Sequence, residues 1–302
     1  MRIHVIARNM GLVLLVNALF MFIAVFVSAI NGFDTGFSPL LLTAIITATI
    51  GSFPYIFVRS SGEVATREGY VIAVLSWAIS CLFGMLPYLL WGGEFTLINA
   101  WYESVSGYTT SGGTILTDVE ILPKSLLFWR ASTHWIGGMG VVIFMLLILP
   151  EVSSIRLKLS KIEISALSQD YFRFRAKETV RVIAIIYFGL TFLEVFCLTL
   201  AGMDFFDAVC HSFATIATGG FSTKNLSIAA YDSQLIEAII MVFMCLSALH
   251  FGMIFLLVAK RSTSLFKSPV TRYFISALLL GSLFVSLSLK LTGTYDTFAE
   301  SF

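Results

Sequence analysis

The chain has 302 residues, of which 58% are hydrophobic and 12% are charged, and its formal net charge at pH 7 is +1. Soluble domains carry about 25% charged residues, so this composition, with a mean hydropathy of +0.91, indicates an integral membrane protein. The near-zero net charge offers no field for nucleic acid, and the four cysteines form no C-x-x-C pair that would indicate a disulfide framework or a zinc site.

Seven segments are apolar over a length that allows them to cross a bilayer, which takes about 20 residues of helix. In chain order they are Gly11–Ile30, Pro39–Val58, Gly69–Trp91, Ala131–Pro150, Val182–Ala201, Ala238–Ala259 and Tyr273–Leu289. The first follows Arg2 and Arg8, as a signal peptide would, but it exceeds the roughly 7–15 apolar residues of a signal core. We therefore expect seven spanning helices, with Glu194 as the one carboxylate inside them.

The positive charges are distributed unequally between the connections. The N-terminus and the segments Arg59–Glu68, Glu151–Arg181 and Lys260–Arg272 alternate onto one side and hold 15 of the 19 Lys and Arg residues. Because cytoplasmic loops carry an excess of Lys and Arg, we expect the N-terminus and these loops in the cytoplasm. The stretch Ser153–Arg181 mixes basic and apolar residues, which is typical of an amphipathic helix on an anionic leaflet and also of a docking surface for a regulatory subunit.

Two outward connections, Phe95–Asp118 and Asp204–Ser227, each begin with about ten moderately apolar residues and continue into a cluster of Thr, Ser and Gly. Ten helical residues rise about 15 Å, which is half of the ~30 Å hydrocarbon thickness. Asn99 and Asp207 suit the N-terminal turns of these half-helices, where a short side-chain oxygen can accept from free backbone N–H groups. Irregular backbone is tolerated at membrane depth only when protein buries it or a water-filled path runs beside it. Each segment alone could be an outer loop with an interfacial helix, but two in corresponding places predict re-entrant segments.

The two segments belong to an internal repeat. A shift of 108 residues matches Asn99 with Asp207, Ser104 with Ser212 and Gly112 with Gly220. The repeated unit is a helix, a half-helix, a Gly-rich strand and a second helix. We expect five regions: a two-helix unit over 1–68, a first pore repeat over 69–150, a cytoplasmic amphipathic linker over 151–178, a second pore repeat over 179–260, and the start of a third repeat over 261–302. That third copy ends within its own half-helix at "DTFAESF", so we expect the chain to be a fragment.

Both copies begin on the inner side and loop at the outer face. A secondary transporter that couples a small solute to Na⁺ or H⁺ would instead predict inverted repeats with breaks in the middle of its spans. The parallel arrangement favours a pore over this alternative, and no nucleophile–base pair indicates an enzyme.

Three motifs carry a resemblance to a known family: "ESVSGYTTSGGTIL" (Glu103–Leu116), "HWIGGMGVVIF" (His134–Phe144) and "HSFATIATGGFST" (His211–Thr223). The chain resembles the Trk/Ktr/HKT superfamily of potassium transporters, and most closely the bacterial TrkH-type uptake subunits, which the two leading helices also fit. The resemblance implies an all-α integral membrane protein of repeated helix–pore half-helix–filter–helix units, similar to potassium channels and preceded by two extra transmembrane helices. It further implies four repeats around one pore, potassium uptake across the bacterial inner membrane, a homodimer and a cytoplasmic nucleotide-binding regulatory subunit. The transported K⁺ would be the ligand, with no organic cofactor.

The resemblance also implies which residues form the selectivity filter. The first strand would be Thr109, Thr110, Ser111 and Gly112, and the second Ala217, Thr218, Gly219 and Gly220. Backbone carbonyls can replace the hydration shell of a cation, and K⁺ is expected at Thr110, Ser111, Thr218 and Gly219. Family members with Ser in place of the first filter glycine favour sodium, so Gly112 points to potassium. Ser111 stands where Thr is usual, and the third and fourth strands are absent from this sequence.

Several residues outside the filter strands are candidates for supporting roles. We expect Glu103 to brace the filter, and Glu194 to lie near the membrane interface or in a local hydrogen bond. The histidines have no metal-ligand spacing and are expected to be packed helix residues: His134, His211 and His250. The glycines after His134 fit either a close helix contact or a bend near a gate: Gly137, Gly138 and Gly140.

Overall fold

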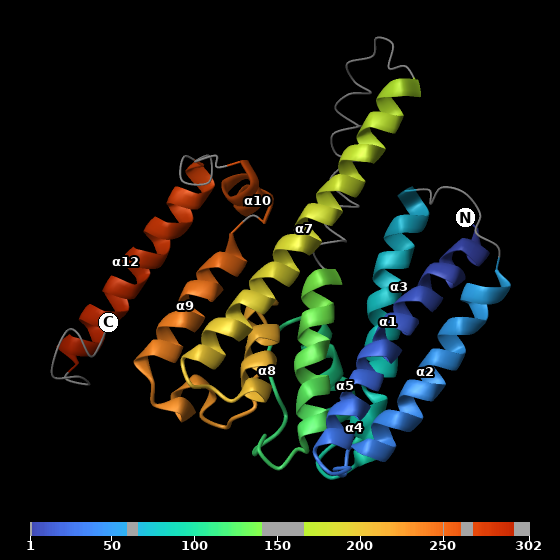
Figure 1. Cartoon of the computed structure of the whole chain (residues 1–302), viewed down its shortest axis with the longest axis horizontal. Coiled ribbons are helices and arrows are strands. Elements are labelled where there is room, and N and C mark those ends of the chain that lie inside the picture. Colours follow the sequence, from blue (N-terminus) through green and yellow to red (C-terminus); the bar gives the residue numbers. More distant parts are fainter. Residues whose placement is uncertain (1, 59–65, 141–165, 250, 261–267, 293–302) are drawn as a thin grey trace. The chain divides into compact units, whose positions relative to one another are not determined.

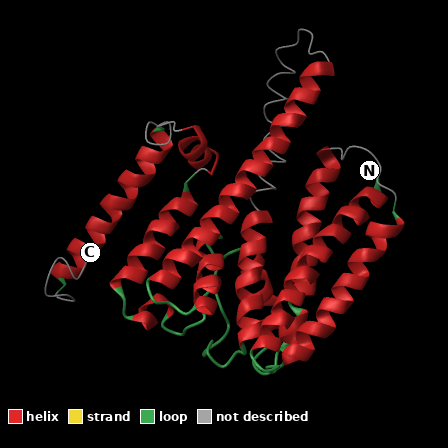
Figure 2. Cartoon of the chain, viewed as in Figure 1, coloured by secondary structure: helices red, strands yellow, loops and turns green. Residues whose placement is uncertain are grey.

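The computed structural model describes residues 2–58, 66–140, 166–249, 251–260 and 268–292, which form helices and loops with no strand among them (Figure 2). This confirms the all-α prediction. The chain divides into two compact units, Met1–Ala248 and Leu249–Phe302.

The first unit opens with two long helices, α1 (Ile3–Ile30) and α2 (Phe37–Phe57), which run side by side (Figure 1). They approach closely where both carry glycine: a Cβ on Gly51 would lie 2.9 Å from the carbonyl oxygen of Gly11. Small residues allow this kind of contact between membrane helices. The turn between α1 and α2 is tied to the first repeat because Asp34 accepts hydrogen bonds from the Ser125 hydroxyl (2.6 Å) and amide (3.1 Å).

The first repeat comprises α3 (Thr66–Gly84), α4 (Leu86–Trp91), the half-helix α5 (Leu97–Tyr108), a return segment and a helix over residues 124–140. α3 and α4 together form one apolar segment, Arg67–Trp91, in which the helix is interrupted at Met85. A proline lies in the first turn of α4. Carbonyl groups near this interruption find partners elsewhere: the Ser104 hydroxyl donates to the Cys81 oxygen (2.8 Å) and the Trp129 indole to the Gly84 oxygen (3.1 Å).

The second repeat comprises α7 (Ala166–Leu200), the half-helix α8 (Phe205–Ile216), the short η1 (Ser227–Tyr231) and α9 (Gln234–Ala248). α7 is continuous over 35 residues, so one helix crosses the position 178/179 where the linker was expected to give way to the second repeat. Residues 151–165 of that linker lie outside the described part of the chain.

The second unit contains α10 (Phe251–Lys260) and α12 (Pro269–Leu291). The prediction of a single span over Ala238–Ala259 is wrong, because α9 ends at Ala248 and residue 249 is a bend. Hydropathy could not reveal this break, since the sequence is equally apolar on both sides of it; glycine at position 252 lowers the helix propensity beside the break. The third half-helix expected at 296–302 lies outside the described residues.

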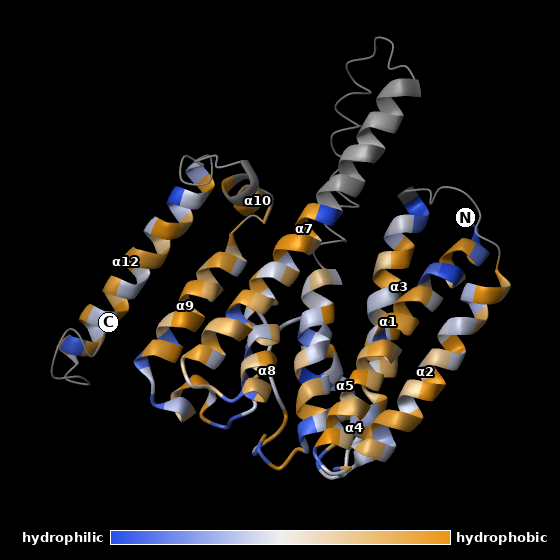
Figure 3. Ribbon diagram, in the orientation of Figure 1, coloured by the Kyte–Doolittle hydropathy of each residue, from blue (hydrophilic) through white to orange (hydrophobic). Residues whose placement is uncertain are grey.

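Five of the seven expected spans are confirmed as helices long and apolar enough to cross a bilayer: Ile3–Ile30, Phe37–Phe57, Arg67–Trp91, Arg181–Leu200 and Pro269–Leu291. Large apolar side chains on them stay uncovered by protein, such as Phe26 (64% exposed) and Phe192 (70%). Figure 3 shows hydrophobic residues along the helices and hydrophilic ones near many helix ends. Such surfaces suit contact with lipid, where every backbone polar group is satisfied inside a helix.

The core of the first unit surrounds the half-helix α5. Trp129, Tyr88 and Tyr108 are among the largest fully buried side chains. The Tyr108 hydroxyl donates to the side-chain oxygen of Asn17 (3.1 Å), whose amide nitrogen donates to Ser80 (2.8 Å). This buried polar chain joins α1, α3 and α5, so the half-helix is fixed by the leading helices as well as by its own repeat.

Candidate functional site

The half-helices α5 and α8 are each 12 residues long, which corresponds to a rise of about 18 Å. Their N-termini are capped by Thr96, whose hydroxyl accepts from the Asn99 amide (3.3 Å), and by Asp204, whose carboxylate accepts from the Phe206 amide (3.1 Å). Asn99 and Asp207 lie in the first helical turns, as the sequence predicts, but they are not the N-caps. An N-cap has non-helical backbone one position before the helix; Thr96 and Asp204 satisfy this and are also 108 residues apart.

The C-terminal ends of the two half-helices have the same hydrogen-bond pattern. In α5 the amide of Thr110 bonds to the Gly107 oxygen (3.0 Å) and that of Ser111 to the Ser106 oxygen (3.1 Å). In α8 the equivalent amides of Thr218 and Gly219 bond back in the same way, at 2.9 and 2.8 Å. These pairs of bonds define a Schellman motif, in which the residue after the helix cap takes the left-handed conformation.

The residues in that left-handed position are threonines. Thr110 has a φ of 56° and Thr218 a φ of 55°, where glycine is the usual occupant. A β-branched residue at positive φ is an outlier, and such strain costs of order 1–3 kcal/mol and concentrates at functional sites. Two residues further on, Gly112 (φ 75°) and Gly220 (φ 92°) repeat the positive φ.

These bonds also determine which way the carbonyl groups point. In a trans peptide the N–H and C=O groups face opposite directions. Because the amides of Thr110 and Ser111 point back into α5, the carbonyl groups of Thr109 and Thr110 point away from it. The same argument applies to Ala217 and Thr218 beyond α8. Each half-helix is therefore followed by two carbonyl oxygens that point away from it.

The extended segments that follow α5 and α8, called return strands here although they form no β-sheet, contact each other. A Cβ added to Gly112 would collide with the carbonyl oxygen of Gly219 and lie 3.7 Å from the Cα of Gly220. Gly112 therefore has no room for a side chain, in addition to its positive φ. Of the eight residues predicted for the filter, Gly112 thus lies against Gly219 and Gly220, with the Gly219 carbonyl oxygen at the contact.

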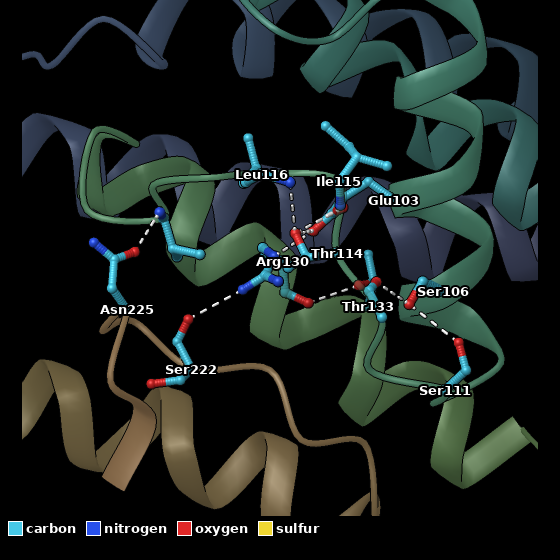
Figure 4. Close-up of polar contacts among 12 residues, drawn as sticks. Glu103, Ser106, Ser111, Thr114, Ile115, Leu116, Arg130, Thr133, Ser222 and Asn225 are labelled. Carbon is cyan, nitrogen blue, oxygen red and sulfur yellow. Dashed lines mark hydrogen bonds and ion pairs between the residues drawn. The ribbon is translucent and has the colours of Figure 1, made fainter. Parts of the chain in front are cut away.

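Each half-helix holds its own return strand through side-chain hydrogen bonds, and one of these comes from an equivalent position in both. Glu103, fully buried in α5, accepts hydrogen bonds from the Thr114 hydroxyl (2.9 Å) and the Ile115 amide (3.2 Å), as Figure 4 shows. In α8 the matching residue His211 lies 3.0 Å from the Ser222 hydroxyl through Nε2 and 2.8 Å from the Asp207 oxygen through Nδ1. The expectation that Glu103 braces the strand agrees with this geometry, and His211 is a hydrogen-bonded helix residue as expected.

A buried arginine connects the two repeats. Arg130, on helix 124–140, pairs with Glu103 (Nε to Oε1, 2.6 Å) and donates to the Ser222 carbonyl oxygen at 3.0 Å (Figure 4). Its guanidinium carbon also lies 3.5 Å from the ring centroid of Phe221. Sequence reasoning did not select Arg130; the available signal was a lone charge directly before an apolar run, since buried charges are almost always paired.

The outer loops of the repeats are joined by an asparagine. Asn225 accepts from the Val119 amide (2.7 Å) through its side-chain oxygen and donates to the Asp118 carboxylate (2.7 Å) through its side-chain nitrogen. Its own amide donates to Glu120 (3.1 Å). The segments that follow the two return strands are thus fixed to each other as well.

Glu194 and the glycines of helix 124–140, also candidates from the sequence, are packed against neighbouring parts of the chain. Glu194 is completely buried on α7, which packs against α8. Its expected location near the membrane interface or in a local hydrogen bond stays a prediction. Gly137 has no space for a Cβ, which would collide with the Tyr108 carbonyl oxygen, and a Cβ on Gly138 would lie 2.9 Å from that of Ala217. These contacts agree with the close-packing alternative. His250 lies outside the described residues.

The apolar helices and the paired half-helices define a multi-pass membrane protein built from pore-type repeats. Residues 39–293 match the TrkH family, described as cation transport proteins, and the chain belongs to this family. It is 35% identical to the Trk system potassium uptake protein TrkH of Halomonas elongata, with 98% of this chain and 62% of that protein aligned. It is 39% identical to the protein of the same name from Escherichia coli K12, over 72% of this chain and 46% of that protein.

The fold comparison agrees with the sequence comparison. The crystal structure of the potassium transporter TrkH from Vibrio parahaemolyticus matches 100% of this chain and 62% of its own, with a TM-score of 0.85 and 31% sequence identity. The chain thus spans about three fifths of the length of the Halomonas and Vibrio relatives.

Proposed function

We propose that this chain forms part of a potassium uptake pathway and supplies two of the strands that select the ion. The contact between Gly112 and the Gly219 carbonyl oxygen carries the proposal, because it places equivalent strands of two repeats beside one another. The relatives from Halomonas elongata and Escherichia coli are named potassium uptake proteins, which supports K⁺ as the transported ion.

In this mechanism backbone oxygens replace the water around K⁺. The carbonyl groups of Thr109, Thr110, Ala217 and Thr218 face away from the half-helices, so they are available as ligands to a dehydrated cation. The residues proposed to contact K⁺ are Thr110, Ser111, Thr218 and Gly219. The negative C-terminal ends of both half-helices point toward these strands and favour a cation over an anion. Stripping water requires ligands on several sides, so further strands of the same kind complete the ring. The reaction is transport and involves no covalent chemistry.

The parallel repeats support a pore over a solute transporter with inverted repeats. Both half-helices have a side-chain cap, a Schellman end and a bracing side chain at equivalent positions, 108 residues apart along the chain. An inverted repeat would place the two units in opposite directions through the membrane.

The proposal extends to the surroundings of the pathway. The alternation of the basic loops supports a cytoplasmic N-terminus, and the family supports a location in the bacterial inner membrane. The relatives are named after a Trk system, which supports assembly with further components; we propose a homodimer with a cytoplasmic nucleotide-binding regulatory subunit of the Trk type. The orientation is tested by labelling single cysteines, introduced at the N-terminus or at residue 120, with a thiol reagent that cannot cross the membrane. In intact cells we expect the cysteine at residue 120 to be labelled and the one at the N-terminus to be protected.

The filter assignment is tested with Gly112→Ser in the complete gene product, expressed in a bacterium without potassium uptake systems of its own. The added side chain collides with the Gly219 oxygen and disturbs the carbonyl spacing, so we expect the preference for K⁺ over Na⁺ to fall about tenfold or more, where tenfold corresponds to about 1.4 kcal/mol. Gly189→Ser is the matched control, because no atom lies within 4 Å of its Cβ position. An unchanged K⁺ preference in Gly112→Ser, with normal amounts of protein in the membrane, overturns the assignment.

A further inference from the structure

Helix 124–140 of the first repeat lies along the return strand of the second repeat. Arg130, His134 and Gly138 are spaced by four residues and therefore share one face of this helix. Arg130 contacts Ser222 and Phe221 at the outer end of the strand. Gly138 contacts Ala217, at the end nearest α8, where a Cβ on the glycine would lie 2.9 Å from the alanine Cβ.

His134 occupies the middle of this face. Its side chain is completely buried, and its ring stacks on Phe221 with the centroids 3.9 Å apart and the planes at 21°. A Cβ added to Gly219 would collide with the imidazole ring. Within the described part of the chain neither ring nitrogen has a hydrogen-bond partner, so the ring acts on the strand by filling space.

The first return strand is held by different chemistry. Ser106 of α5 lies 3.1 Å from the Ser111 hydroxyl and donates to the Gly113 carbonyl oxygen at 2.6 Å. The residue of α8 that matches Ser106 is Ala214, which has no hydroxyl, and the residue that matches Ser111 is Gly219. The second strand is bonded to α8 further along, by Ser222 to His211 (3.0 Å) and Thr223 to Asp207 (2.7 Å). It lacks the counterpart of the Ser106 bonds, and the His134 ring occupies the place where a side chain at 219 would be.

The glycine at 219 is required by space. Its φ is not in the left-handed region that Gly112 and Gly220 occupy, so an alanine there would meet no backbone penalty. What excludes a side chain is the ring of His134, which lies at contact distance behind the strand, while the carbonyl oxygen of the same residue faces Gly112.

We propose that His134 is a positioning residue for ion selection: by packing behind Gly219 it holds the Gly219 carbonyl oxygen against Gly112 and so sets the spacing of the two neighbouring strands that line the pathway. This rests on the proposed function of the strands as a filter. Because protein interiors are close-packed, removal of a ring behind a strand allows that strand to shift. The K⁺ over Na⁺ preference therefore depends on the volume of the side chain at position 134 and on the space that it leaves for a side chain at position 219.

The test is a double-mutant cycle in the complete gene product, with K⁺ and Na⁺ uptake measured in cells that lack other potassium uptake systems. His134→Ala removes the ring and Gly219→Ala adds a group that collides with it; each alone should lower the K⁺ over Na⁺ preference about twofold to tenfold, the range expected for residues in direct contact. In the double variant the alanine methyl group has room, so the preference should recover to within about twofold of the unmodified protein. Additive losses in the double variant overturn the proposal.

Two substitutions separate packing from hydrogen bonding. His134→Phe keeps a ring without nitrogen atoms and should retain the preference, whereas His134→Gln keeps polar atoms without a ring and should lose it. The opposite order overturns the packing role. The protein in the membrane is quantified for every variant, and if His134→Ala does not accumulate, the Phe, Gln and double variants carry the test.

Gly112→Ser is measured in the same assay to separate this inference from the proposed function. If Gly112→Ser leaves the ion preference unchanged, the filter assignment fails together with the role of His134. If Gly112→Ser lowers the preference but the His134 and Gly219 variants do not interact, the filter assignment stands and only the role of His134 is overturned.

Discussion

Arg130 and Glu103 form an ion pair that is almost completely closed to solvent, with 2.6 Å between Nε and Oε1 and side-chain exposures of 3% and 0%. The two charges come from the helix and the half-helix of the first repeat, yet the arginine also reaches the Ser222 carbonyl oxygen of the second repeat. The pair is therefore part of the connection between the two strands, and breaking it should affect both.

The first prediction concerns this pair. Arg130→Gln should destabilise the protein by about 3–5 kcal/mol, because removal of one partner leaves the other charge buried without compensation. The double variant Arg130→Gln/Glu103→Gln should recover part of the loss, since no charge then remains. Thermal unfolding in detergent and the amount of protein in the membrane are the measurements.

Arg2→Gln is the matched control for the buried pair. Arg2 also pairs with a glutamate, Glu68, at 2.8 Å, with side-chain exposures of 40% and 4%. Because water reaches the arginine half of this pair, its loss should cost less than the loss of Arg130. A loss in Arg130→Gln no larger than that in Arg2→Gln contradicts the prediction.

The second prediction concerns the strained threonines. Thr218→Gly should be more stable than Thr218→Ala by about 1 kcal/mol, because glycine adopts a φ near 55° without a Cβ penalty. Both variants lack the hydroxyl, so the difference reports the backbone alone. Unfolding temperatures of the two purified variants provide the comparison.

Thr215, inside α8, supplies the control for this measurement. It lies in the last turn of α8, where its backbone is helical, and in a helical conformation glycine is less favourable than alanine. The order of the Gly and Ala variants should thus be reversed between positions 215 and 218. The same order at both positions would show that Thr218 is not strained.

The third prediction concerns the caps of the half-helices. Thr96→Ala should cost about 1 kcal/mol of stability, because the Asn99 amide loses its acceptor. Thr96→Ser keeps the hydroxyl and should cost little. Asp204→Ala and Asp204→Asn form the equivalent pair for α8. Equal stability of Thr96→Ala and Thr96→Ser would mean that the cap contributes nothing.

The fourth prediction concerns the glycines of helix 124–140. Gly137→Ala should destabilise the protein and reduce uptake, because the new methyl group collides with the Tyr108 carbonyl oxygen at the end of α5; overpacking of this kind costs about 1–3 kcal/mol. Gly189→Ala, in the open surface of α7, should instead stabilise by about 0.5–1 kcal/mol through helix propensity. If Gly137→Ala behaves like Gly189→Ala, the glycine serves flexibility rather than packing.

Much of the architecture could be read from local patterns. Apolar runs predicted five helices that the structure confirms as long enough to span a bilayer, and the shift that matches Gly112 with Gly220 predicted two equivalent segments. Hydropathy and repeat spacing are properties of neighbouring residues, so they are visible without any knowledge of packing. The bend at residue 249 was missed because hydropathy does not report backbone direction.

The contacts between the repeats were decided only by the tertiary structure. The sequence by itself determined that two half-helices end in Thr and Gly clusters, because the helix length, the caps and the Schellman ends use hydrogen bonds within a few residues. It did not reveal that Arg130 reaches Ser222, 92 positions away, or that the ring of His134 fills the space behind Gly219. Those pairs depend on which helix faces lie together once the chain is packed, and van der Waals contact and buried charge pairing act over a few ångströms in space whatever the separation along the chain.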